Sequence, residues 1–145
     1  MLLTTKSRYA IMALTDLASN TSDSKPIALY EIANRQDITI KYLEQIFVKL
    51  RKTGIVISSK GPGGGYILAK DPSEFKLIEV IIAVEEDIRM TRCSMTKIGC
   101  MTKGVKCVTH DLWKGLENIV ENYFGSITLA DLCRSTKQQQ EFIKC

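Results

Sequence analysis

The feature that most constrains how this chain can fold is a glycine-rich segment, Lys60 to Gly65, between two short apolar runs. Four of its six residues are glycine, the residue that adopts turn conformations most freely. The flanking runs, 55–59 and 66–69, are rich in residues that favour β-strands. We therefore expect a β-hairpin with a long tip. The glycine spacing matches neither of the common nucleotide-binding loops.

Three helices are expected before this hairpin. Apolar residues three and four positions apart predict a helix over about 6–20 and a shorter one that stops at Gln36-Asp37. Thr39 can cap a third helix, which Gly54 ends. The predicted buried stripe of that helix is Ile40, Leu43, Ile46 or Phe47, and Leu50. Helix, tight turn, helix and basic-tipped hairpin is the order of a winged helix-turn-helix.

The pattern of the second half of the chain predicts helices on both sides of one loop. A fourth helix is predicted at 77–84, and Thr128 with Asp131 predicts the cap of a last one. Between them, a near-heptad stripe is typical of a helix packed along a partner helix. Its members are Leu112, Leu116, Ile119 and Tyr123, with Trp113, Val120 and Phe124 widening it. The predicted fold is thus mostly α with a small β-hairpin: a winged helix-turn-helix domain over 1–75, then a loop (93–110) and dimerisation helices over 76–145.

Charge is unevenly distributed along the chain. Residues 1–70 carry ten Lys/Arg against five Asp/Glu, whereas residues 71–145 carry ten against eleven. A positive excess confined to one half favours a module that faces nucleic acid. No apolar run reaches the roughly 18 residues that a membrane span needs, so we expect a cytoplasmic protein, without membrane association, whose five cysteines stay reduced.

The third helix presents side chains that suit the DNA major groove. Gln45 can form two hydrogen bonds with one adenine, and Lys41 can reach guanine or a phosphate. Tyr42 can form a hydrogen bond with a backbone phosphate. On the hairpin, Lys60 is expected near the minor groove. The alternative is a solvated helix face, and the surrounding helix-turn-helix order is what favours DNA.

Cysteine and histidine spacing predicts a metal centre. Cys93, Cys100 and Cys107 lie seven residues apart, and His110, the single histidine, follows after two residues. Thiolates and a neutral imidazole bind zinc or iron–sulfur clusters. Structural zinc sites usually pair cysteines roughly two to four residues apart, so the wider spacing favours an iron–sulfur cluster. A zinc site and a loop that binds no metal are the two alternatives. No second histidine or paired carboxylates support catalysis, and we expect a non-enzyme.

Five runs together form a specific signature: Leu3 to Ala10, Tyr42 to Gln45, Leu50 to Lys52, Gly61 to Tyr66, and Cys107 to Trp113. Through them the chain resembles the IscR family of bacterial iron–sulfur cluster assembly regulators over nearly its whole length. The resemblance implies a homodimeric winged-helix repressor of cluster-assembly genes. Its partners would be double-stranded DNA and the assembly machinery that delivers a 2Fe-2S cluster.

The same resemblance assigns individual residues. It implies cluster ligation by Cys93, Cys100, Cys107 and His110, DNA contact by Thr39, Lys41, Tyr42, Gln45 and Lys60, and a role for Glu44 in distinguishing operator classes. The chain departs from the family where Lys41 replaces a usual serine, where Lys60 replaces an arginine, and where each gap between cysteines is one residue longer. The alternatives are a zinc-stabilised DNA-binding or interaction protein and a related nitric-oxide- or iron-sensing repressor.

Overall fold

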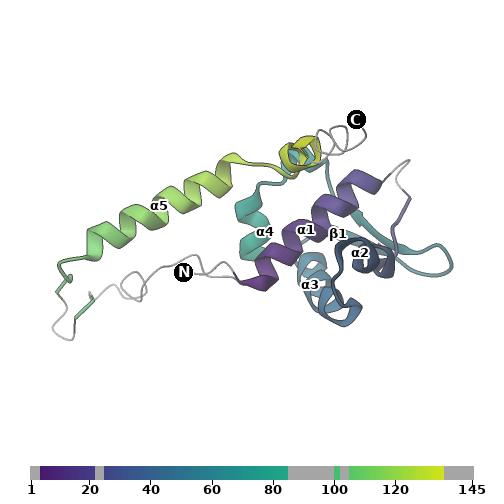
Figure 1. The fold of residues 1–145 in the computed structure, drawn as a ribbon, viewed down its shortest axis with the longest axis horizontal. Coiled ribbons are helices and arrows are strands. Elements are labelled where there is room, and N and C mark those ends of the chain that lie inside the picture. The colour runs from purple at the N-terminus through teal and green to yellow at the C-terminus, as the bar shows by residue number, and fades with distance from the viewer. Residues whose placement is uncertain (1–3, 22–24, 85–99, 102–104, 136–145) are drawn as a thin grey trace.

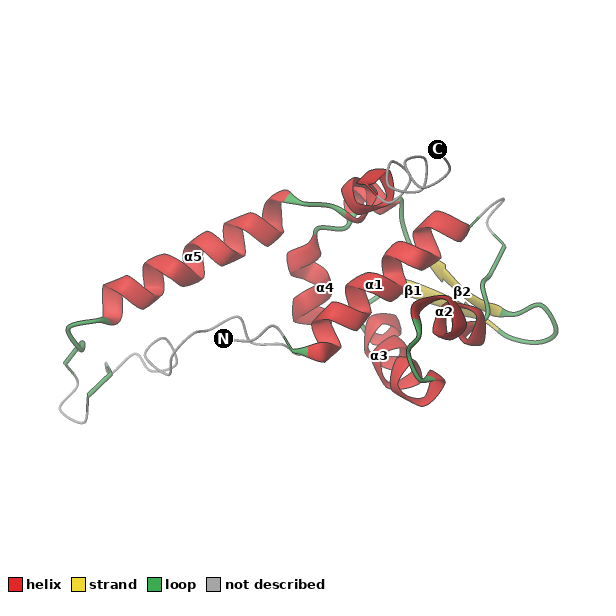
Figure 2. Cartoon of the chain, in the orientation of Figure 1, coloured by secondary structure: helices red, strands yellow, loops and turns green. Residues whose placement is uncertain are grey.

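The computed structural model describes residues 4–21, 25–84, 100–101 and 105–135 of the 145-residue chain. It is a mostly helical fold with one antiparallel hairpin, which confirms the predicted fold class (Figure 2). In chain order the elements are α1 (Thr5–Asn20), α2 (Leu29–Gln36), α3 (Ile40–Lys52), β1 (Val56–Ser59), β2 (Gly65–Leu68), the 3₁₀-helix η1 (Pro72–Glu74), α4 (Leu77–Ala83) and α5 (His110–Ser126). Residues 129–135 are also helical.

One hydrophobic core joins α1, α2, α3 and α4 (Figure 1). Its interior side chains, including Leu14, Ile32 and Phe47, are fully buried. Burying a side chain of this size stabilises the fold by about 1.5 to 3 kcal/mol. Val80 of α4 and Leu129 belong to the same core, so residues on both sides of position 75 pack together. The division at 75 into two domains stays a prediction.

The start of α3 differs from the prediction. Ile46 and Phe47 are both buried, but Ile40 is 45% exposed, because it is the first residue of the helix and the buried stripe begins one turn later. Thr39 occupies the N-cap position with extended backbone angles, yet its side chain makes no capping hydrogen bond. Its carbonyl accepts from the backbone N–H of Tyr42 and Leu43, at 3.1 Å in both cases.

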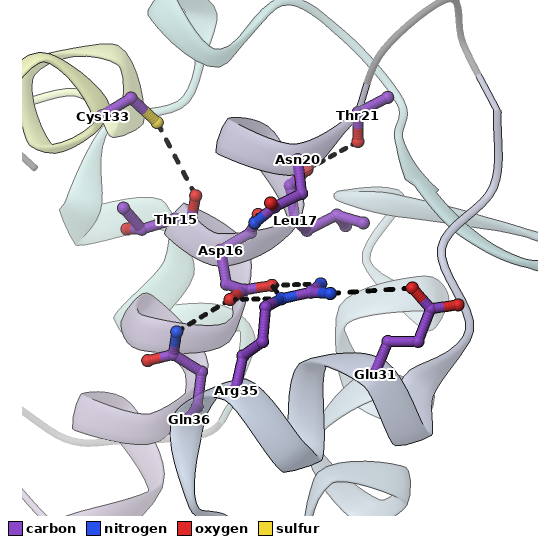
Figure 3. A network of polar contacts seen from close by, with 9 residues as sticks. All are labelled: Thr15, Asp16, Leu17, Asn20, Thr21, Glu31, Arg35, Gln36 and Cys133. Carbon is purple, nitrogen blue, oxygen red and sulfur yellow. Dashed lines mark hydrogen bonds and ion pairs between the residues drawn. The ribbon is translucent and has the colours of Figure 1, made fainter. Parts of the chain in front are cut away.

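A polar network fixes α2 against α1 (Figure 3). The Asp16 carboxylate is 6% exposed and accepts hydrogen bonds at 2.7–3.0 Å from Arg35 and at 2.8 Å from the Gln36 amide. The hydrogen bond to Asp16 raises the pKa of the Arg35 guanidinium. Directly after α2, Asp37 adopts left-handed angles (φ 52°, ψ 46°), which form the tight turn expected after this helix. The network therefore sets the position from which α3 departs.

The hairpin is attached to the body of the fold along two sides. Tyr66 of β2 exchanges backbone hydrogen bonds of 2.8 and 3.0 Å with Ile27. Its ring also packs edge-on against Phe47 of α3, with 4.8 Å between ring centroids. At Gly65 an added Cβ would lie 2.2 Å from the carbonyl oxygen of Ile27. Glycine is thus required there, and the hairpin packs directly against α3.

Helix α5 extends away from this body, so that its His110 end and the hairpin tip lie at opposite ends of the molecule (Figure 1). The chain returns to the core through backbone bonds between Leu77 and Ile127 (2.9 Å) and between Leu129 and Phe75 (3.0 Å). The predicted cap is confirmed, since the Asp131 carboxylate accepts from the Thr128 backbone N–H at 2.8 Å.

Among the described residues, no helix combines the length and the apolar character of a membrane span.

Candidate DNA interface and cluster site

The outward face of α3 is polar because its opposite face fills the core. Burial of Leu43, Phe47 and Leu50 turns the remaining positions outward. The exposed residues are Thr39, Ile40, Lys41, Glu44, Gln45, Val48, Arg51 and Lys52. The predicted contact residues Lys41, Glu44 and Gln45 therefore share one exposed surface. Tyr42 lies at its edge, half-buried, with its ring edge-on to Tyr9 at a centroid distance of 5.7 Å.

Positive charge continues from α3 onto the hairpin. The last turn of α3 carries Lys49, Arg51 and Lys52, and the Arg51 guanidinium donates to the Ser58 hydroxyl of β1 at 3.5 Å. Lys60, at the start of the hairpin tip, is exposed. A helix face that carries amide and lysine side chains, followed by a basic hairpin, can bond base edges with the first and phosphates with the second.

The hairpin tip depends on glycine for its shape. Gly61 and Gly63 have φ of 92° and 74°, values that favour glycine. A Cβ on Gly64 would lie 2.4 Å from the Ser59 carbonyl oxygen. The tip is therefore narrow and exposes backbone next to Lys60, which suits close approach to a nucleic-acid backbone.

The structure brings part of the predicted ligand set together at the start of α5. The Cys100 thiol lies 2.9 Å from Nδ1 of His110, the first residue of that helix. The His110 backbone N–H donates to the Cys107 carbonyl at 3.0 Å, and the Cys107 thiol lies 3.6 Å from the Thr109 hydroxyl. Cys93 lies outside the described residues. Two donor side chains are thus in contact, with a third on the adjoining turn.

This pair fits a metal-bound group with a small adjustment. Two ligands of one tetrahedral metal, with ordinary metal–sulfur and metal–nitrogen bond lengths, lie about 3.5 Å apart. Cys100 and His110 are closer by about half an ångström, so the two side chains need to separate only slightly. The N-terminal end of the α5 helix dipole also favours a negatively charged group there. The residues present therefore suit a thiolate- and imidazole-bound iron or zinc centre.

Two positioning features were missed from sequence. Asp16 interrupts the apolar stripe of α1, and that single acid among alanines and leucines was the available signal for a buried partner. On α5, which the structure describes in full, only Glu117 is buried; it is 2% exposed, and Lys114 Nζ lies 3.7 Å from its carboxylate. The three-residue spacing of Lys114 and Glu117 was the signal for that pair.

Comparison with known proteins identifies the family. A family model described as an iron-dependent transcriptional regulator, Rrf2, matches residues 3–135. The HTH-type transcriptional regulators IscR of Cronobacter sakazakii and of Escherichia coli K12 are each 48% identical over 132 residues, which cover 91% of this chain and 80% of theirs. The chain is also similar to the solved structure of T. potens IscR, with a TM-score of 0.76 and 31% identity over 97% of this chain and 91% of the other.

A second solved structure, CymR, the global cysteine regulator of B. subtilis, has a TM-score of 0.77 at 27% identity and covers 93% of this chain and 98% of its own. These relatives are named as regulators, in agreement with the prediction of a regulator rather than an enzyme. With its winged-helix fold and a family match over most of its length, the chain belongs to the Rrf2 family of iron-dependent transcriptional regulators.

Proposed function

We propose that the chain is a homodimeric DNA-binding repressor of iron–sulfur cluster assembly genes, and that a 2Fe-2S cluster bound by Cys93, Cys100, Cys107 and His110 controls its operator choice. The observation that carries the proposal is the 2.9 Å contact between the Cys100 thiol and His110 Nδ1 at the start of α5. Support also comes from relatives that bear the name IscR at 48% identity. The protein would act in the cytoplasm and receive its cluster from the iron–sulfur assembly machinery.

The protein residues in this proposal hold the cluster and orient α5. Deprotonated thiols and a neutral imidazole are the forms that bind iron. When bound, the cluster supplies a redox-active, negatively charged centre whose occupancy follows iron–sulfur supply. Because His110 is the first residue of α5, ligation through its ring would restrain the end of this helix.

Dimerisation is proposed through the exposed stripe of α5. Leu112, Ile119 and Tyr123 are 64%, 66% and 61% exposed in the single chain, and Leu116 is 37% exposed. Their spacing of four, three and four residues matches a helix packed along another helix. The 17 residues of α5 span about 25 Å. A second copy of this helix would cover the stripe.

A continuous path of contacts supports coupling between the two sites. Helix α5 packs against α4, and α4 packs against α1 and α3. At the end of α4, the carbonyl of Val84 accepts a hydrogen bond of 3.4 Å from Lys49 on α3. In the proposed mechanism, Cys93, Cys100, Cys107 and His110 would hold the cluster and thereby restrain the start of α5 in one arrangement of the dimer. Helix α4 would transmit that arrangement to the two copies of α3.

On the DNA side, the proposal assigns base reading to the exposed face of α3 and backbone contact to the residues around it. Lys41, Glu44 and Gln45 would face base edges in the major groove, while Thr39 and Tyr42 would contact phosphates. Lys60 would approach the minor groove. Lysine at this position lacks the planar donor fork of arginine, so it contributes charge more than base geometry.

The cofactor is tested by metal and sulfide analysis of protein purified without oxygen. We expect about two irons and two acid-labile sulfides per chain, together with visible absorption, and we expect His110→Ala to change that absorption. Cys133→Ser is the matched control, because this thiol bonds to the Thr15 carbonyl of α1 at 3.8 Å, away from the proposed ligands. One zinc per chain without sulfide would instead make the protein a zinc-stabilised DNA-binding protein.

The DNA interface is tested separately through salt dependence. Each phosphate contact contributes about 0.9 to the slope of log affinity against log salt concentration. Lys60→Ala is expected to lower that slope by about this amount, as measured by fluorescence anisotropy with duplexes selected from a randomised pool. Arg134→Ala, which removes an exposed cation from the last helix, is expected to leave the slope unchanged. An unchanged slope for Lys60→Ala would remove Lys60 from the interface.

A further inference from the structure

We infer that Val48 reads a thymine by apolar contact with its C5-methyl group in the DNA major groove. The inference rests on the proposed DNA-binding function and adds a residue that decides sequence preference. Val48 lies on α3 with 54% of its surface exposed. It belongs neither to the hydrophobic core nor to the partly buried side chains packed against that core. The hydrophobic core of the single chain therefore does not use this side chain.

Helical spacing places Val48 on the same stripe as the proposed base-reading residues. It follows Gln45 by three residues, Glu44 by four and Lys41 by seven, and all four are exposed. Residues at these separations lie on one helix face. The same pattern of first, fourth, fifth and eighth positions is used by the homeodomain recognition helix to read the major groove. Val48 occupies the last of these four positions.

The chemistry of the groove selects one target for a valine. Among the groups that base pairs present in the major groove, the thymine C5-methyl is the apolar one, and side-chain methyl groups contact it. Polar and charged residues surround Val48 on α3: Glu44 and Gln45 one turn before it, and Arg51 and Lys52 one turn after it. The other exposed apolar residue of α3 is Ile40, two turns earlier, with Glu44 between them, so the two do not form one of the broad apolar patches that bind other proteins. We therefore assign it to DNA.

The test removes the methyl group from the DNA rather than from the protein. Duplexes enriched from a randomised pool by the full chain, purified without oxygen, are resynthesised with each thymidine replaced in turn by deoxyuridine. Loss of one well-packed methyl contact is expected to weaken binding about fourfold at one thymine in each half-site. At that thymine, Val48→Ser is expected to bind the two duplexes equally.

Two controls separate this contact from general binding. Lys41→Ala is expected to weaken binding to every duplex while it retains the fourfold difference between thymine and uracil. Thermal unfolding followed by circular dichroism is expected to show the same midpoint for Val48→Ser as for the parent chain, since the side chain is exposed.

The outcomes distinguish the inference from the proposed function. If the parent chain binds a selected sequence but no uracil replacement weakens it, or if Val48→Ser keeps the sensitivity, the assignment of Val48 is overturned and DNA binding stands. If the pool yields no enriched sequence, sequence-specific DNA binding itself fails, and the inference fails with it.

Discussion

The body of the fold and helix α5 use their apolar residues in opposite ways. In the body, formed by α1 to α4 and the hairpin, side chains such as Leu14, Leu43 and Phe47 are completely buried. In α5 the single buried residue is the acid Glu117, while Ile119 and other large apolar residues face outward. The body therefore completes its hydrophobic core within one chain, whereas α5 presents apolar surface that a second chain can cover.

This difference has an energetic consequence. A single helix of the length of α5 is marginal in water unless one of its faces is packed. Most of the length of α5 projects away from the body, which the helix approaches at its C-terminal end (Figure 1). The stability of the body should thus respond to mutations in the core and in the polar network, and that of α5 to mutations that alter association.

The largest expected effect, and the sharpest test of the comparison, is a pair of glycine substitutions with opposite signs. Gly65→Ala should destabilise the body by about 3 kcal/mol, because its Cβ would meet the backbone of Ile27 at 2.2 Å. Gly115→Ala, in α5, has open space around the new Cβ and should stabilise by about 0.5 to 1 kcal/mol through helix propensity. Urea denaturation at one protein concentration measures both. Equal effects would contradict the proposed division.

The polar network of the body should give the next largest effect. Arg35→Ala leaves the buried Asp16 carboxylate without its bidentate partner. Breaking a fully buried pair costs about 3 to 5 kcal/mol. Because the Arg35 side chain is 36% exposed, solvent screens the pair, and we expect a loss of about 2 kcal/mol in the free energy of unfolding by urea. Arg134→Ala, which breaks the exposed pair with Asp131, is the control and should change stability little.

The smallest of the three effects concerns association. Ile119→Lys places a charge within the exposed stripe of α5 and should weaken self-association at least about tenfold, from the loss of one buried aliphatic side chain. Sedimentation equilibrium measures the dissociation constant. Ile57→Lys, at a similarly exposed isoleucine on the hairpin, is the matched control and should leave it unchanged. If Ile119→Lys dimerises as well as the parent chain, the α5 stripe is not the dimer interface.

Much of the fold followed from the sequence. The helices at α1, α2 and α3 lie within one or two residues of their expected bounds, and the hairpin forms around Lys60 to Gly65. Such agreement is expected where one face of each element is apolar, because the repeats of helix and strand are set locally by the backbone. Ile40 was predicted in the buried stripe but is exposed. Periodicity predicts which residues lie on the same helix face, but it does not predict where along the helix the contact with the core ends.

The two candidate sites were also predicted only in part from the sequence. By spacing alone, Lys41 and Gln45 were expected on one helix face, and they are exposed together. Glu44, which only the family resemblance assigned to the interface, is exposed beside them. Spacing also proposed Cys100 and His110 as ligands of one centre, but their contact at 2.9 Å depends on how the loop turns before α5. That all four residues bind one cluster stays a prediction.

By itself, then, the sequence determined the order and type of the elements, the basic face of α3 and the cysteine–histidine set. Only the tertiary structure decided that Asp16 and Arg35, nineteen residues apart, form a bidentate pair, that Phe47 locks the hairpin through Tyr66, and that Val48 stays outside the core. Periodicity is a property of neighbouring residues along the chain. Partners across the fold are instead chosen by packing and by the cost of leaving a buried charge unpaired.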